Sequence, residues 1–255
     1  MDMNAEGLRA FTLKEVKRFW SVLGQTVTAP VMTALLYLLV FGQVMEGRVE
    51  VYPGVSYMQF LIPGLIMMSV IQNSFANASS SLTQSKIMGN LVFVLMAPLA
   101  AWELFAGYLA ASLLRAGLVS LALYCATWPF VHLPIHSFLQ LVGMFLLAGG
   151  SLAVVGIIAG IVASKFDHLA SFQNFLILPA SFLSGVFYSI HSLPDFWSNL
   201  SRFNPFFYMI DGFRHAFLGV GDAPVWLCFA STGGLFVVLS ATCLRMLATG
   251  YKLRP

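Results

Sequence analysis

The stretch NPFFYMIDGFRHAFLG, residues 204–219, places an amide, a carboxylate, a guanidinium and an imidazole close together in a chain of which only 9% is charged. Pro205 suits the first turn of a helix capped by Asn204, because proline has no amide hydrogen to leave unpaired. Asp211 and Arg214 then share one face and are predicted to pair, which lowers the free energy of holding either charge near lipid. The alternative is an interfacial helix that carries this pair on its surface.

A serine protease is a second chemistry that the residue types allow. Ser184 lies in the sequence LSG, and His191 or His215 could serve as its base. The full Gly-x-Ser-Gly setting is absent, and His215 already belongs to the polar stretch at 204–219. An intramembrane serine protease is therefore a weak alternative.

Metal and nucleotide chemistry are both disfavoured. His132 and His136 have the spacing of two ligands on one helix face, but a proline between them interrupts a helix. Cys125, Cys228 and Cys243 lie in apolar runs without metal-ligand or disulfide-like spacing. No G-x-x-x-x-G-K-[ST] occurs in the sequence, so we expect no nucleotide, cofactor, metal or catalytic site on this chain.

The composition is that of a membrane protein. Hydrophobic residues make up 59% of the chain and the mean hydropathy is +0.85, whereas soluble domains are about 25% charged. The 255 residues leave room for about six spans of roughly 20 residues with short connections. No room remains for a separate catalytic or nucleotide-binding domain.

Six apolar runs can cross a bilayer as helices, which predicts an all-α polytopic membrane protein. The first run is too long to be the core of a cleaved signal peptide. No acidic residue lies inside any run, whereas an ion-coupled secondary transporter, the principal alternative, uses membrane-embedded carboxylates. The runs cover residues 20–44, 60–82, 104–128, 138–163, 170–190 and 225–247.

The distribution of basic residues predicts the topology. With the N-terminus in the cytoplasm, nine lysines and arginines fall on inner segments and three fall outside, as the positive-inside rule requires. Both termini are therefore expected in the cytoplasm. The inner residues are Arg9, Lys14, Lys17, Arg18, Lys86, Lys165, Arg245, Lys252 and Arg254, and the outer ones are Arg48, Arg202 and Arg214.

Arg115 is the most isolated charge, because it lies about halfway along the third run. A charge at the bilayer centre costs roughly 2.5–3.5 kcal/mol on insertion scales, so Arg115 is expected to face protein or water, or to snorkel toward a leaflet edge, and it could recognise an anionic substrate. Glu103 is about 18 Å away along the helix, which is too far for a direct contact. The polar run QNSFANASSSLTQ, with Asn73 and Asn77, predicts a cavity or a subunit interface; local bonds to backbone are the alternative.

Three further segments have distinctive patterns. Residues 8–20 are predicted to form an imperfect amphipathic helix with basic residues on one side, or else a merely basic flank of the first span. Residues 85–103 form an inner loop that is unusually apolar for a segment in the cytoplasm, which indicates that it packs against something. Residues 191–224 hold apolar runs too short to cross the bilayer, and a pair of short helices dipping in from the outer face fits them.

The order of these parts resembles the ABC-2 type transporter permeases, the membrane subunits of bacterial ATP-driven exporters. The resemblance covers essentially the whole chain. Its most specific element is NPFFYMIDGFRHAFLG, followed by FLIPGLIMM; KEVKRFW, LMAPLAAWEL and the segment FLSGVFYSIHSLPDFWSNLSRF also fit.

The resemblance implies a division of labour. It implies one transmembrane domain over residues 1–255, an inner-membrane location, a dimer that is simplest as a homodimer, and two separate ATPase subunits that bind ATP and Mg²⁺. The substrate would be a drug, a lipid, or a glycolipid or polysaccharide, moved out of the cytoplasm or inner leaflet. Membrane lipid surrounds such a subunit, and no nucleic acid is an expected partner.

The resemblance also assigns roles to segments. Residues 1–19 would be an interface helix, 85–98 a coupling helix inserted into the ATPase, and 193–218 a pair of outer re-entrant helices. The family's coupling loop usually carries charges in its middle, whereas GNLVFVLMAP has none, so no docking salt bridge follows for this loop. The residues implied in ATPase coupling are Lys14, Glu15, Lys17, Arg18, Ile87, Asn90, Val92, Phe93 and Pro98; those of the outer gate are Asn204, Pro205, Tyr208, Asp211 and Arg214; and those of a possible cavity are Asn73, Asn77 and Arg115.

Overall fold

The computed structural model describes residues 4–45, 47 and 50–253, and within these residues it is helical apart from loops and one isolated bridge. The prediction of an all-α protein is confirmed. Arg48 and Arg254, which entered the topology count, lie outside the described residues. The α-helices are α1 Ala5–Trp20, α2 Leu23–Tyr37, α3 Gln43–Met45, α4 Tyr57–Ile87, α5 Leu91–Met96, α6 Ala101–Thr127, α7 Phe138–Val162, α8 Phe166–Phe172, α9 Leu178–Phe182, α10 Asp195–Phe203, α11 Pro205–Leu218 and α12 Val225–Thr249; the π-helical turns are η1 Leu38–Gly42 and η2 Gln173–Ile177, and η3 Ile190–Ser192 is a 3₁₀ turn.

Five helices of the described residues are long and apolar enough to cross a membrane. They match the first, second, third, fourth and sixth predicted runs, with ends that shift by a few residues. The second helix exceeds its predicted length by the most, because its polar final turns are buried against neighbouring helices and continue the helix. The five are Leu23–Met45, Tyr57–Ile87, Ala101–Thr127, Phe138–Val162 and Val225–Thr249.

The remaining run, predicted at 170–190, is different in the structure. Helices α8 and α9 with η2 between them form one helical segment that starts earlier and ends at Phe182. Pro179 has no amide hydrogen for the regular ladder, which accounts for the adjoining π turn, and Gly185 turns the chain with φ +75°. The segment is too short to be among the five long helices, so the boundaries predicted for it are wrong.

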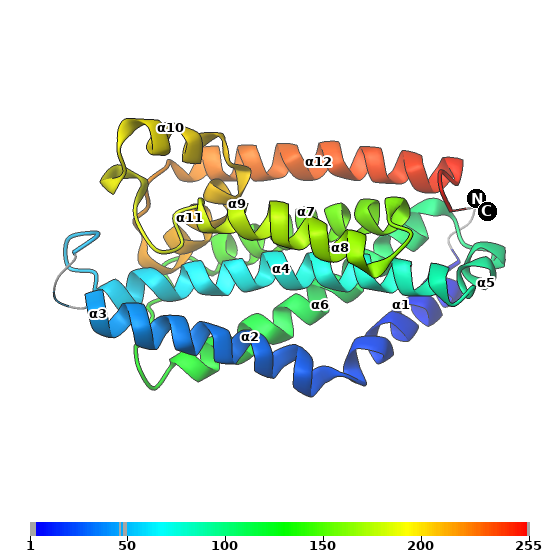
Figure 1. Ribbon diagram of the computed structural model, residues 1–255, viewed down its shortest axis with the longest axis horizontal. Coiled ribbons are helices and arrows are strands. Elements are labelled where there is room, and N and C mark those ends of the chain that lie inside the picture. Colours follow the sequence, from blue (N-terminus) through cyan, green and yellow to red (C-terminus); the bar gives the residue numbers. More distant parts are fainter. Residues whose placement is uncertain (1–3, 46, 48–49, 254–255) are drawn as a thin grey trace.

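Helix α4 lies at the centre of the bundle, between α2, α6, α7 and α11 (Figure 1). Its contact with α7 depends on glycines. A Cβ atom placed on Gly156 would lie 2.6 Å from the Phe75 carbonyl oxygen, and one on Gly160 would lie 2.9 Å from the Leu82 Cβ. Small residues therefore bring these two backbones together, as in other membrane helix pairs.

The short elements gather at the two ends of the bundle. The start of α1, helix α5 and the end of α12 lie at one end, while α3, α10 and α11 lie at the other (Figure 1). Hydrogen bonds connect the segments at the first end. The Asn4 amide donates to Glu103 Oε1 at 2.7 Å, and Asn4 Nδ2 donates to the Pro98 carbonyl at 3.2 Å. Segments predicted on opposite sides of the membrane are thus separated by the length of the bundle.

Candidate functional site

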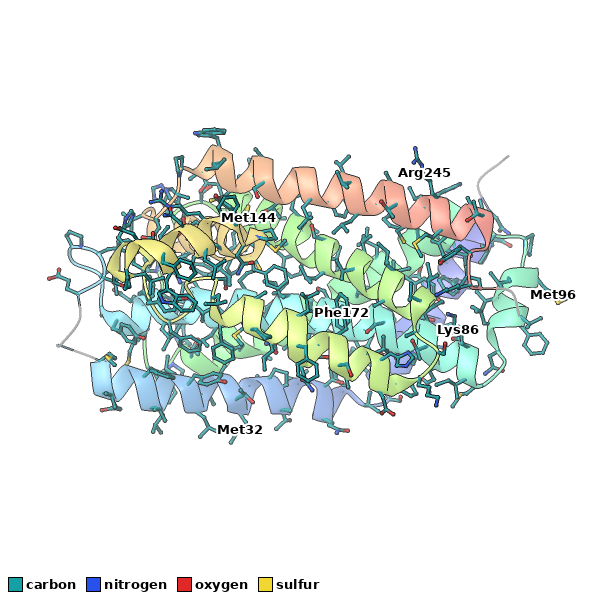
Figure 2. The ribbon with its side chains drawn as sticks, turned by 45° about the horizontal axis from the view of Figure 1, so that its top comes forward. Met32, Lys86, Met96, Met144, Phe172 and Arg245 are labelled. Carbon is teal, nitrogen blue, oxygen red and sulfur yellow. The ribbon has the colours of Figure 1, made fainter. Side chains whose placement is uncertain are left out.

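Helix α5 presents an apolar surface at its end of the bundle. It begins two residues after Gly89, whose φ of +72° reverses the chain leaving α4, and it is anchored by the buried Leu91. Phe93 is 73% exposed and Met96, which projects from the tip in Figure 2, is 77% exposed. We call the exposed group the α5 patch; it consists of Ile87, Met88, Val92, Phe93 and Met96.

A basic cavity adjoins the α5 patch. Its volume is about 430 Å³, and it is bordered by Lys86, Lys252 and residues of α5. The Lys86 ammonium donates to the Ile161 and Ala163 carbonyls, so this lysine supplies a hydrogen-bond donor to carbonyl groups at the C-terminal end of α7. Asn90 and Pro98, predicted to take part in coupling, are exposed on either side of α5.

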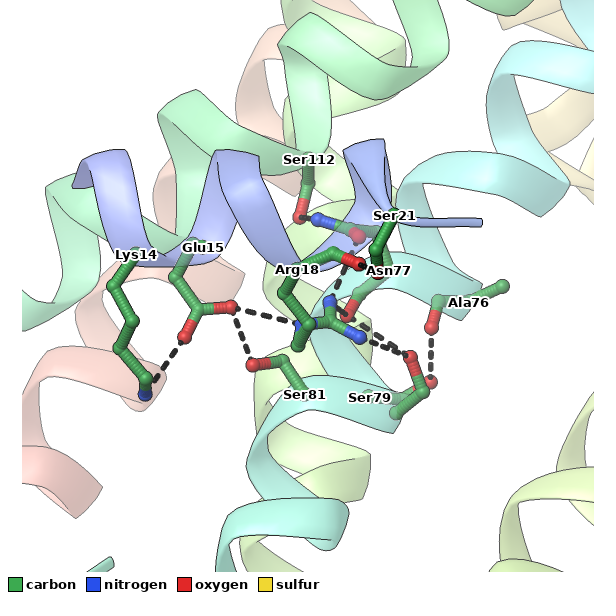
Figure 3. A network of polar contacts seen from close by, with 10 residues as sticks. Lys14, Glu15, Arg18, Ser21, Ala76, Asn77, Ser79, Ser81 and Ser112 are labelled. Carbon is green, nitrogen blue, oxygen red and sulfur yellow. Dashed lines mark hydrogen bonds and ion pairs between the residues drawn. The ribbon is translucent and has the colours of Figure 1, made fainter. Parts of the chain in front are cut away.

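One of the charged residues of α1 that were predicted to take part in ATPase coupling points into the bundle. Glu15 is fully buried, where its carboxylate accepts from Ser81 of α4 and pairs with Arg18 at 3.3 Å (Figure 3). Lys14 pairs with the same carboxylate at 3.2 Å from the surface, and Lys17 is exposed. Of the four predicted coupling residues on α1, the two lysines therefore face outward, while Glu15 binds α1 to α4.

The network continues from α1 through α4 to α6 (Figure 3). Arg18 Nη2 donates to the side-chain oxygen of Asn77 at 2.8 Å, and Asn77 Nδ2 donates to Ser112 Oγ at 3.2 Å. The polar run on α4 thus makes contacts between helices. The alternative, bonds to nearby backbone, also holds for part of the run, since Ser79 donates to the Phe75 carbonyl.

Arg115 faces the same region from α6. Its Nη2 lies 3.4 Å from Asn73 Oδ1, which is a long hydrogen bond, and its buried Nε has no partner. Glu103 is engaged elsewhere, as its carboxylate accepts from the Asn4 and Ala100 amides. The three residues predicted to line a cavity are therefore near one another, and the partner of Arg115 that the sequence did not name is an asparagine.

At the opposite end, Asp211 and Arg214 form the predicted pair. Their closest atoms are 3.7 Å apart and both side chains are buried, so the alternative of a surface pair is wrong. Arg214 also donates to the carbonyls of Phe60 at 3.3 Å and Gly185 at 2.7 Å, and its guanidinium lies 3.8 Å from the centre of the Phe60 ring. Arg214 thereby joins α11 to α4 and to the loop after α9.

The beginning of α11 has the predicted form. Asn204 caps the helix by accepting from the Phe206 amide at 3.1 Å, and Pro205 occupies its first turn. Tyr208, the remaining residue of the predicted outer gate, is partly buried and packs edge-on against Phe207. These residues position α11 beneath α10, whose Phe196 and Phe203 remain exposed.

Sequence reasoning missed a second carboxylate, the partly buried Asp222, that completes this outer cluster. Asp222 accepts from Tyr52 Oη and Ser189 Oγ, both at 2.7 Å, and from the Ile190 amide. Burial raises the pKa of Tyr52, so its hydroxyl stays protonated and donates. Asp211 accepts from the Asp222 and Ala223 amides. The partners come from distant loops, so no sequence spacing could have revealed them.

The protease alternative finds no support in the geometry. The Ser184 hydroxyl is buried and donates to the Ser181 carbonyl. Among the described residues, no hydrogen bond joins Ser184 to a histidine. A nucleophile would need a base within reach of its proton.

Comparison with known proteins decides the family. The sequence model described as "ABC-2 type transporter" matches residues 6–218. The chain belongs to the ABC-2 type transporter family. Its ABC-2 membrane permease domain lacks nucleotide-binding motifs, so membership implies association with an ATPase subunit.

Relatives match over nearly the whole chain. The inner membrane transport permease YadH of Escherichia coli K12 is 36% identical over 247 residues, covering 97% of this chain and 96% of YadH. Nodulation protein J of Sinorhizobium fredii is 28% identical over 228 residues, covering 88% of this chain and 80% of that protein. The ABC-2 protein described here is accordingly a multi-pass permease of the inner membrane.

Proposed function

We propose that this permease is the membrane half of an ATP-driven exporter whose ATPase subunits dock on the α5 patch. The observation that carries the proposal is the exposure of Phe93 and Met96 on a short helix outside the long spans. A monomeric surface does not usually leave such residues together in water, and an apolar patch of this kind is typical of a binding surface. Lys14 and Lys17 are exposed on α1, whose start lies at the same end of the bundle (Figure 1), and they add positive charge on this side of it.

Transmission of movement from this end would use α4. The helix has 31 residues and is about 46 Å long, so it reaches from α5 to the outer cluster around Arg214. At the α5 end, Glu15 and Arg18 also bind α4 to α1. ATP-driven motion of the ATPases would therefore move α1, α4 and α5 together, as a rigid-body rearrangement of packed helices.

Six spans and a cytoplasmic location of both termini complete the proposed architecture. The segment α8–η2–α9 would be the remaining span, with α10 and α11 as re-entrant helices on the outer face. The distribution of basic residues supports this topology: Lys14, Lys17 and Lys86 lie toward the α5 end, whereas Arg202 and Arg214 lie in α10 and α11. The functional unit would be a homodimer with two ATPase copies, each binding ATP and Mg²⁺.

The proposed substrate is hydrophobic or lipid-like. A groove of about 190 Å³ runs between α2 and α4, bordered by Tyr37, Leu65 and Met68. A larger cavity of about 540 Å³ near the outer end is lined by Phe41, Phe187 and neighbouring residues. The larger cavity also has polar residues, among them Glu50 and His191, and this mixture of apolar and polar surface suits a lipid, a glycolipid or a drug moving outward from the inner leaflet.

Affinity purification of the tagged chain in mild detergent, followed by mass spectrometry, tests this function. We expect a P-loop ATPase to co-purify in amounts equal to the permease. Recovery of the chain alone would remove the energy source and would reopen the ion-coupled alternative.

A further inference from the structure

A polar cavity lies among α1, α2, α4, α6 and η2, on the α5 side of the apolar groove. Its volume is about 440 Å³, and its walls carry two guanidinium groups and several amides. The polar side chains that define it are Arg18, Gln25, Gln72, Asn73, Arg115 and Gln173.

The cavity carries one positive charge that no protein group balances. Arg18 is paired with Glu15 at 3.3 Å and is bonded to Asn77. Arg115 has only the 3.4 Å contact with Asn73, and no carboxylate of the described residues forms an ion pair with it. An unpaired charge among membrane helices is unfavourable, and a negative group entering the cavity would relieve it.

Two buried donors in the cavity wall are also without acceptors. They are Arg115 Nε and Gln72 Nε2. A buried donor left unpaired is unfavourable, so native structures seldom keep two in the wall of one cavity without a ligand or water. Both donors would be satisfied by an oxygen-rich anion, and guanidinium groups match phosphate and carboxylate particularly well.

The apolar groove between α2 and α4 continues from this cavity. The two share Ala29, Pro30 and Gln72, and the groove then runs along Tyr37 and Met68. A ligand that filled both would have an anionic head and an apolar chain. Neither the polar cavity nor the groove alone indicates such a molecule, whereas the continuity of the two indicates it.

We propose that the cavity binds the anionic headgroup of an amphiphile, a phosphate ester or a carboxylate, while the apolar part lies in the groove between α2 and α4. The proposal rests on the export function above and deepens it by naming the substrate class. Arg115 provides the uncompensated charge, Gln72 and Asn73 orient the headgroup, and the Glu15–Arg18 pair holds α1 against the cavity.

Binding to the purified full-length chain in a neutral maltoside detergent tests the proposal. The probes are dihexanoyl phosphatidate and, as a zwitterionic counterpart, dihexanoyl phosphatidylcholine, titrated by calorimetry. We expect the phosphatidate to bind at least about tenfold more tightly, because its headgroup has a net negative charge, whereas the trimethylammonium of phosphatidylcholine balances its phosphate and would place a second positive charge near Arg115. Equal affinity for the two lipids would overturn the proposal.

Matched variants locate the site. Arg115→Gln removes the charge and should raise the phosphatidate Kd at least about tenfold, whereas Arg245→Gln removes an equal charge from the exposed face of α12 and should leave it unchanged (Figure 2). Gln72→Met removes one unpaired donor without altering charge, and should raise the Kd about threefold even if Arg115→Gln fails to fold. An unchanged Kd in folded Arg115→Gln contradicts the assignment.

Inorganic phosphate distinguishes the two sources of such an anion. Displacement of phosphatidate by equimolar inorganic phosphate assigns the site to a soluble anion, and lack of displacement assigns it to a lipid headgroup. The titration requires no ATPase. Non-selective binding by a chain that recovers its ATPase would therefore reject this site alone, while selective binding by a chain without an ATPase would reject the ATP-driven function.

Discussion

Arg214 shows how a single charge is held within this apolar bundle. Its guanidinium has the Asp211 carboxylate at 3.7 Å, two carbonyls within hydrogen-bond distance and an aromatic ring below it. Breaking a buried pair by removing one partner leaves the other charge without compensation, which costs about 3–5 kcal/mol.

Arg214→Met should therefore lower the thermal unfolding midpoint of the purified permease markedly. The substitution keeps an apolar side chain of similar length and removes the charge and its donors. Arg202→Met, on the exposed side of α10, is the control and should leave the midpoint nearly unchanged. Equal midpoints for the two variants would show that the outer cluster does not stabilise the fold.

The pair itself could be predicted from sequence, because residues three apart share a helix face. Its carbonyl partners at Phe60 and Gly185 could not, since they come from other parts of the chain. The same limit of sequence reasoning applies to Glu15 of α1. The helical pattern predicted a charged side of α1, but only the packing of α1 against α4 shows that Glu15 is turned inward.

At the scale of secondary-structure elements, the contact between helices α4 and α7 is central to the packing of the bundle. Gly156 lies where the two backbones approach most closely, and a Cβ there would meet the Phe75 carbonyl oxygen at 2.6 Å, a contact that requires backbone movement. We expect Gly156→Ala to lower the unfolding midpoint and the yield of folded protein. Overpacking of this kind typically costs about 1–3 kcal/mol.

Gly234→Ala on α12 provides the matched control for Gly156→Ala. A Cβ at Gly234 has no atom within 4 Å, so this change should be neutral or slightly stabilising. If Gly156→Ala behaves like Gly234→Ala in the same thermal assay, the close contact between α4 and α7 is not as described.

The long helices were predictable because apolar runs of sufficient length have few other structures in a membrane. The short ones were less so. Hydropathy placed a span at 170–190, whereas the helix shifts toward Phe166 because Pro179 and Gly185 interrupt the regular ladder near its end. The apolar loop predicted at residues 85–103, in which the resemblance implied a coupling helix over 85–98, contains the end of α4, the short helix α5 and the start of α6.

The proposed topology can be tested on the whole molecule by single cysteines at its two ends. In a Cys125→Ser background, where Cys228 and Cys243 are buried, Met96→Cys and Phe203→Cys place a thiol on α5 and α10 respectively. A membrane-impermeant maleimide added to intact spheroplasts should label the Phe203→Cys protein and spare the Met96→Cys protein until the cells are opened. The opposite pattern would invert the topology.

Co-purification of the ATPase with two glutamate variants tests most directly whether the α5 patch couples this permease to its energy source. Phe93→Glu introduces a charge into the patch, and Phe203→Glu introduces the same charge at another highly exposed phenylalanine, at the far end of the bundle. Recovery of a P-loop ATPase should fall about tenfold or more with Phe93→Glu, since burying an unpaired charge in an apolar interface is unfavourable, and should be unchanged with Phe203→Glu. Full recovery with folded Phe93→Glu would contradict the assignment of α5 as the docking helix.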